Sequence, residues 1–260
     1  MAHGDDPPEL PYTSQMDKMT QEIANPNLIL DPFAPIDQYC ERTAQGLLAE
    51  PMNLVTNLSF IIAGLSILKF VRNNPHIQQR PGSQLLPSLM ITIGLGSALF
   101  HSLANLWSMW ADIIPIGVFV LTYLWLFLRN EAKVSLFTSI SLFVCFFLLS
   151  FVCSKLADGQ AANGGEAYFG TWITLFGISC YYGGRGDPRK FLAVGSAALT
   201  FSLSLFFRTV DMRLCDQWSM GTHLLWHVFN GVVLFLVTKA YLENTGPVLK
   251  SHPLGVDSGP

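Results

Sequence analysis

The stretch Thr222-His-Leu-Leu-Trp-His-Val228 opens the last long apolar segment of the chain and carries two histidines four residues apart. Four residues make roughly one helical turn, so the side chains of His223 and His227 leave the same face of a helix. The segment as a whole, about residues 219–243, is long and apolar enough to cross a bilayer. Paired histidines near the end of such a helix predict a site at the boundary between hydrocarbon and water.

The composition of the chain is that of an integral membrane protein. Half of the 260 residues are hydrophobic and only 13% are charged, whereas a soluble domain carries about 25% charged residues. A membrane helix needs about 20 predominantly apolar residues. Seven segments meet or approach this length, at about residues 53–72, 84–105, 111–129, 133–153, 167–183, 189–208 and 219–243. Because their connections are short, the sequence predicts a single all-α bundle of seven transmembrane helices.

The distribution of lysine and arginine predicts the orientation of this bundle, because short cytoplasmic loops carry the excess of these residues. With seven crossings, the side that holds the N-terminus has Lys18, Arg42, Lys155, Arg208 and Arg213. The opposite side has twice as many, namely Lys69, Arg72, Arg80, Arg129, Lys133, Arg185, Arg189, Lys190, Lys239 and Lys250. We therefore expect the N-terminus outside the cell or in a lumen and the C-terminus in the cytosol.

The two ends of the chain differ from its apolar middle. Residues 1–35 lack an apolar run, and we expect a flexible tail without a signal-peptide core. Residues 244–260 are rich in Gly, Pro and Ser and predict a disordered tail. The membrane domain is thus expected over residues 36–243. The sequence has no nucleotide-binding glycine loop and no basic stripe typical of nucleic-acid binding, and it indicates no obligate protein partner.

A second apolar segment carries polar residues that match the late histidine pair. In Gly94-Leu-Gly-Ser-Ala-Leu-Phe-His101, Ser97 lies one turn before His101, and Asp112 opens the apolar run that follows. In the predicted topology these residues and the late pair lie at one level of the membrane. Ionisable groups at membrane depth are costly, so function is the first hypothesis for them. Alone, each has a simpler explanation: an interfacial histidine, a serine bonded to its own helix, or an aspartate that caps one.

Together these residues predict a metal site. His101, His223 and His227 supply three nitrogen donors, and three protein ligands with a fourth position open to water are typical of catalytic zinc. Zinc is the expected ion because imidazole suits it and the group contains no cysteine, although iron and copper also accept imidazole. Asp112 is the expected proton acceptor for water activated by the metal, and Ser97 the expected donor to a developing oxyanion. The chemistry indicated is hydrolysis of an acyl bond in a lipid.

The serine, the aspartate and the three histidines resemble the signature of the alkaline ceramidase family, within the wider CREST group of seven-helix membrane hydrolases and receptors. The segments 49–57 (AEPMNLVTN) and 210–216 (VDMRLCD) also resemble that family, so the similarity covers about residues 37–243. The resemblance implies zinc bound by the three histidines, with Asp112 and Ser97 assisting. It implies cleavage of ceramide, or a related N-acyl lipid, to a sphingoid base and a fatty acid.

The resemblance also implies two features outside the membrane helices. Family members of the eukaryotic type bind calcium before the first helix, and Asp37, Glu41 and Glu50 lie in the similar region of this chain. These residues form either a calcium site or a solvated acidic loop. Cys40 and Cys215 both fall on the predicted oxidising side and resemble a paired couple of the family, which implies a disulfide.

Other functions stay open at the level of sequence. A seven-helix receptor or scaffold would keep the same zinc for structure without turnover, although the presence of Asp112 and Ser97 favours the enzyme. A haem-binding electron carrier is less favoured, because haem needs axial ligands on opposite faces of its ring and His223 and His227 share one helix face. The membrane is either a bacterial inner membrane or one of the endoplasmic reticulum or Golgi type.

Overall fold

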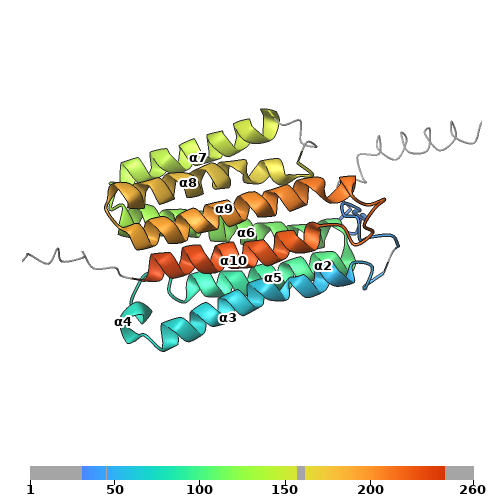
Figure 1. Cartoon of the computed structure of the whole chain (residues 1–260), viewed down its shortest axis with the longest axis horizontal. Coiled ribbons are helices and arrows are strands. Elements are labelled where there is room, and N and C mark those ends of the chain that lie inside the picture. Colours follow the sequence, from blue (N-terminus) through green and yellow to red (C-terminus); the bar gives the residue numbers. More distant parts are fainter. Residues whose placement is uncertain (1–30, 45, 157–161, 244–260) are drawn as a thin grey trace, which may run out of the picture.

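The computed structural model describes residues 31–44, 46–156 and 162–243. Within these ranges the chain is all-helical, and its long helices lie side by side in one bundle (Figure 1). Residues 1–30 and 244–260, which make up most of the two predicted tails, lie outside the described residues. The last part of the expected N-terminal tail is held in place, because Pro32 and Ala34 accept backbone hydrogen bonds from Trp107 (2.9 Å) and Leu106 (3.1 Å).

The helices follow the apolar segments of the sequence. Their bounds are α2 Pro51–Thr56, α3 Leu58–Arg72, α4 Pro75–Gln78, α5 Leu85–Leu103, α6 Leu106–Leu126, α7 Leu136–Leu156, α8 Phe169–Gly184, α9 Pro188–Val210 and α10 His223–Leu242. A π-helical turn, Phe127–Glu131, extends α6. Two 3-10 turns, Gly165–Tyr168 and Asp211–Arg213, precede α8 and follow α9.

Six helical stretches of the described chain are long and apolar enough to cross a membrane. They are Pro51–Arg72, Leu85–Leu103, Leu106–Glu131, Leu136–Lys155, Pro188–Arg213 and His223–Leu242. The α8 helix, with 16 residues, is shorter than these six. The number of crossings, seven, and the orientation of the bundle therefore stay predictions, whereas a multi-pass membrane protein is supported.

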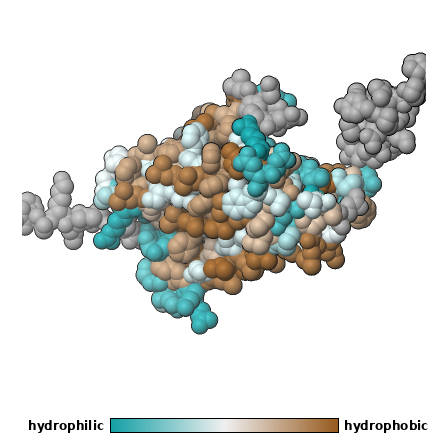
Figure 2. All heavy atoms as spheres, turned by 45° about the vertical axis from the view of Figure 1, so that its right-hand side comes forward, coloured by the Kyte–Doolittle hydropathy of each residue, from teal (hydrophilic) through white to brown (hydrophobic). Residues whose placement is uncertain are grey.

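The surface of the bundle is apolar where a bilayer would cover it. Large hydrophobic side chains are exposed along the outer helices, and Phe137 in α7 is 81% exposed. Figure 2 shows apolar residues over much of the flank of the bundle. An apolar surface this extensive is not typical of a protein in water, and a lipid environment accounts for it.

One predicted boundary was wrong, and the difference bears on the site. The third segment was expected to begin at Ala111, with Asp112 opening it, but α6 begins at Leu106. The side chain of Asn105 accepts a hydrogen bond from the Ser108 backbone (3.2 Å), and the Ser108 hydroxyl accepts one from the Asn105 backbone (3.2 Å). This reciprocal capping starts the helix early. Asp112 therefore lies within the second turn of α6 and is not its cap.

Small residues allow the helices that carry the polar groups to approach closely. A Cβ added at Gly94 of α5 would lie 3.0 Å from the carbonyl oxygen of Asn57, and one added at Gly231 of α10 would lie 2.8 Å from the side chain of Ser59. Glycine at such positions lets helix backbones pack against each other in a membrane. The α3 helix is thereby held against both α5 and α10, which carry the three histidines.

Candidate metal centre

The three predicted ligands meet at one end of the bundle. His101 lies near the end of α5, and His223 and His227 lie in the first turns of α10. Each side chain is about 1% exposed. One nitrogen from each ring lies within 4.8 Å of the other two, and in the described residues this is the one group of His, Cys, Asp or Glu that could hold a metal. Nε2 of His101 and Nε2 of His227 are 3.1 Å apart.

The outer nitrogens of two of these rings already have partners. Nδ1 of His101 lies 2.5 Å from a carboxylate oxygen of Glu50, and Nδ1 of His227 lies 3.0 Å from the hydroxyl of Thr56. Histidines that bind metals typically use the second ring nitrogen in this way, which fixes the tautomer and the direction of the ring. Their Nε2 atoms are left to face each other across the centre.

The third histidine contains a buried nitrogen that needs a partner. Nδ1 of His223 has no hydrogen-bond partner in the described part of the chain. A buried polar atom without a partner costs roughly 1–3 kcal/mol. A cation among the three rings would be bound by one nitrogen of each ring, and a ligand of this kind would offset the cost of an unpartnered nitrogen. The residues present therefore fit a metal ion, and a set of three imidazoles suits zinc.

Glu50 is buried beside His101 and is held on several sides. Its carboxylate is 2.5 Å from Nε of Arg42 and 3.0 Å from the side-chain amide of Asn53. Burial alone would raise the pKa of Glu50, but the hydrogen bonds from His101 and Asn53 and the nearby charges outweigh it and lower the pKa below its usual value. The charged carboxylate thus orients His101.

The calcium expectation gains no support from these residues. The carboxylate of Glu41 accepts hydrogen bonds from the backbone of Met52 (2.7 Å) and of Asn53 (2.8 Å), which are the free N–H groups at the start of α2. Glu50 is engaged by His101. Asp37 is exposed. The two buried carboxylates therefore stabilise a helix end and a histidine, and calcium binding stays a prediction.

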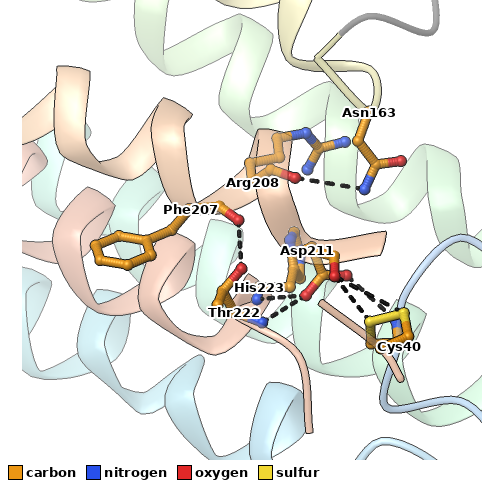
Figure 3. The surroundings of a disulfide bond; sticks show 8 residues. Cys40, Asn163, Phe207, Arg208, Asp211, Thr222 and His223 are labelled. Atoms are coloured by element: carbon orange, nitrogen blue, oxygen red, sulfur yellow. Dashed lines mark hydrogen bonds between the residues drawn. A yellow bond between two sulfur atoms is a disulfide. The ribbon is translucent and has the colours of Figure 1, made fainter. Parts of the chain in front are cut away.

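Asp211 fixes the backbone at the start of α10 (Figure 3). One oxygen of its carboxylate accepts from the backbone N–H groups of Thr222 (2.6 Å) and His223 (2.9 Å), and the other accepts from the backbone of Cys40 (3.2 Å). Cys40 is joined to Cys215 by a disulfide with a Cα–Cα distance of 5.2 Å. The position of His223 is therefore tied both to the end of α9 and to the N-terminal segment.

A partly buried arginine and a buried tyrosine lie beside the histidines. The ring of Tyr39 stacks on that of His223, with 3.7 Å between ring centroids. The guanidinium of Arg208 lies over the rings of Tyr39 (5.7 Å), Tyr168 (5.9 Å) and Trp226 (5.0 Å). It also donates to the Tyr39 hydroxyl at 3.3 Å. Burial raises the pKa of Tyr39 to about 12, so its hydroxyl keeps its proton.

Asp112 and Ser97 lie where α5 and α6 pack closely, at Gly96. A Cβ added at Gly96 would lie 2.8 Å from the backbone carbon of Ala111 and 3.4 Å from the nitrogen of Asp112. Ser97, the next residue, is buried and within hydrogen-bonding reach of the Asp112 carboxylate. Oδ1 of Asp112 is buried and has no hydrogen-bond partner among the described residues. Asp112 also interacts electrostatically with His101.

An apolar cavity borders the histidines on the side of the bundle core. Its volume is about 80 Å³, and its lining includes Phe60, Ile116, Phe201 and Trp226. The ring of Phe60 lies 6.1 Å from that of His227 between centroids. The cavity is therefore a small apolar space in the bundle core, next to residues that pack against the polar centre.

Comparison with known proteins places these residues in context. A family model described as Ceramidase matches residues 34–246, which include every residue of the centre. A comparison with curated individual proteins gives no match.

Proposed function

The chain belongs to the ceramidase family, and on that premise we propose that it is a zinc-dependent amide hydrolase that cleaves ceramide, or a related N-acyl lipid, within the membrane. Membership of this family implies hydrolysis of the ceramide amide bond. The observation that carries the zinc-dependent mechanism is the compact, buried group of three histidines. Glu50 orients the ring of His101, and Thr56 orients that of His227. Asp112, which interacts with His101, has a buried carboxylate oxygen without a partner among the described residues.

In the proposed centre His101, His223 and His227 hold the zinc. Bound zinc would supply a Lewis acid that polarises a carbonyl and brings the pKa of water toward about 7. The three ligands leave a coordination position open, which distinguishes a catalytic from a structural site, because structural zinc is almost always bound by four protein ligands. This count favours the enzyme over a receptor or scaffold with structural zinc.

Asp112 is the proposed general base and acid. Its Oδ1 would accept the proton of the water that attacks the amide carbonyl, and it would return a proton to the nitrogen as the C–N bond breaks. The products are a free amine and a carboxylic acid, so protons balance. Ser97 would hold the carboxyl group of Asp112 in place or donate to the oxygen that gains charge as the carbonyl is attacked.

The apolar cavity is the proposed place for the hydrocarbon of the substrate. Most of the side chains that line it are apolar, which suits the part of a hydrocarbon chain next to the polar group. A ceramide has two long chains that meet at a polar amide, which matches an apolar space next to residues that pack against the histidines. The acyl bond of a membrane lipid would reach the centre without leaving an apolar environment.

A test of this function compares zinc content and fatty-acid release on detergent-purified protein. We expect one zinc per chain and cleavage within a panel of ceramides, with both lost in His227→Ala. The matched control is His76→Ala, because His76 is an exposed histidine outside the centre. Stoichiometric zinc without hydrolysis of any lipid would favour the receptor, and wild-type protein without metal would overturn both functions.

A further inference from the structure

A second polar site lies at the end of the bundle opposite the histidines. It is an open pocket between the π-helical turn after α6, the loop before α5, the loop between α8 and α9, and the end of α10. The α10 helix begins with His223 and ends with Leu242, so its 20 residues separate the two sites by about 30 Å. The pocket therefore lies near the other surface of the membrane, at the depth of lipid headgroups.

The floor of this pocket is a partly buried network of ion pairs. Glu131 pairs with both Arg80 and Lys190, the latter at 2.7 Å from the carboxylate. Lys190 is only 5% exposed. The hydroxyl of Tyr182 donates to the same carboxylate at 3.4 Å. One carboxylate is thus shared by two cations. A second, that of Asp187, also lines the pocket and accepts from the backbone of Lys190 at 3.1 Å.

The rim of the pocket adds further cations. Lys133, Arg185 and Arg189 line it and are exposed. In the part of the chain that the structure describes, no salt bridge engages any of the three. Glu243, at the edge of the pocket, pairs with Lys239 instead. The rim therefore offers two guanidinium groups and an ammonium group to a ligand. The lining as a whole has five cationic side chains and three carboxylates, so positive charge is in excess.

We propose that this pocket binds the phosphate group of an anionic ligand at the membrane surface. Arginine forks match the oxygens of a phosphate with two parallel hydrogen bonds. Basic pockets between membrane helices on the side that carries the excess of lysine and arginine are suited to anionic lipid headgroups. The aromatic rings of Tyr181 and Tyr182 beside the cations suit the boundary between headgroups and hydrocarbon. This site does not depend on the proposed hydrolysis.

The test measures binding of phosphatidylglycerol to the full chain, purified in detergent mixed with phosphatidylcholine. Bound lipid is counted by native mass spectrometry, and the rise in unfolding temperature on addition of lipid is followed in parallel. We expect the double variant Arg185→Gln/Arg189→Gln to weaken phosphatidylglycerol binding about tenfold. The matched control is Lys69→Gln/Arg72→Gln, which removes the same charge from exposed positions outside the pocket, and we expect a change below about twofold.

A competition with inorganic phosphate distinguishes the two sources of the ligand. Displacement of phosphatidylglycerol by millimolar phosphate assigns the site to the phosphate group alone, and lack of displacement assigns it to an intact lipid headgroup; both support the proposal. Two outcomes overturn it. One is equal binding of phosphatidylglycerol and phosphatidylcholine by the wild type, and the other is an equal loss in the double variant and its control.

Discussion

At the scale of single residues, Glu50 links the N-terminal segment to the metal centre. Its carboxylate contacts His101, Arg42 and Asn53, so the charge is held where it directs the imidazole. We expect Glu50→Gln to weaken zinc binding about 10- to 100-fold, because an amide cannot match the charged acceptor opposite Nδ1 of His101. A chelator titration measures the affinity, and Asp37→Asn, which changes an exposed carboxylate, is the control. Unchanged affinity in Glu50→Gln would remove Glu50 from the centre.

Asp112 provides the second prediction at this scale. Asp112→Asn leaves the three histidines and the shape of the side chain intact but removes the proton acceptor. We expect normal zinc content and a fall in kcat of about 10²- to 10⁴-fold, with little change in KM. Metal analysis and fatty-acid release on the same preparation check both parts. A variant that keeps its kcat would assign the proton transfers to another group.

The meeting of the three histidines was predictable from sequence, but the partners of their rings were not. The spacing of His223 and His227 in a membrane segment indicated that they share a helix face. The predicted topology placed His101 at the same depth in the membrane. Thr56 lies 171 residues from His227, and Glu50 lies 51 residues from His101. No local pattern connects such pairs, because helix packing alone brings them together. In the same way, the sequence did not reveal that Glu41 binds the start of α2 and Glu50 binds His101; the calcium implied by the family resemblance stays a prediction.

At the scale of elements, the contact of α5 with α6 sets the distance between Ser97 and Asp112. We expect Gly96→Ala to push the two helices apart, because the added Cβ meets the backbone of Ala111. The cost is about 1–3 kcal/mol of stability, with a larger proportional loss of activity. Thermal unfolding in detergent and fatty-acid release measure the two effects. The control is Gly117→Ala in α6, whose added Cβ meets nothing within 4 Å. If the two variants behave alike, the close contact does not position the pair.

The helices themselves were largely predictable, because apolar length determines where a membrane helix lies. The predicted helix bounds are wrong where a polar side chain determines where a helix begins or is interrupted. Asn105 and Ser108 cap α6 earlier than hydropathy indicates. The first segment is divided at Asn57 into α2 and α3. Hydropathy averages over many residues, so it does not register a single side chain that starts or interrupts a helix.

At the scale of the whole molecule, α8 decides between six and seven crossings. One end of α8 lies beside the π-helical turn, since the hydroxyl of Tyr181 donates to the backbone of Glu131 at 3.2 Å. At the other end, a Cβ added to Gly165 would lie 3.7 Å from the side chain of Arg208. With the 3-10 turn that precedes it, α8 reaches between both ends of the bundle. We therefore propose that α8 also crosses the membrane, which gives seven crossings, although it is shorter than the six other membrane helices.

Sidedness provides the last prediction. Seven crossings put the loops at Lys133 and Arg185 on the same side of the membrane and Asp37 on the other, whereas six crossings without α8 separate Lys133 from Arg185. We expect a membrane-impermeant maleimide applied from outside to label Asp37→Cys in intact cells or sealed vesicles. Lys133→Cys and Arg185→Cys should react only after the membrane is opened. The background replaces the free cysteines Cys145, Cys153 and Cys180 with alanine. Labelling of Arg185→Cys but not Lys133→Cys from outside would show that α8 does not cross, and labelling of both would reverse the predicted orientation.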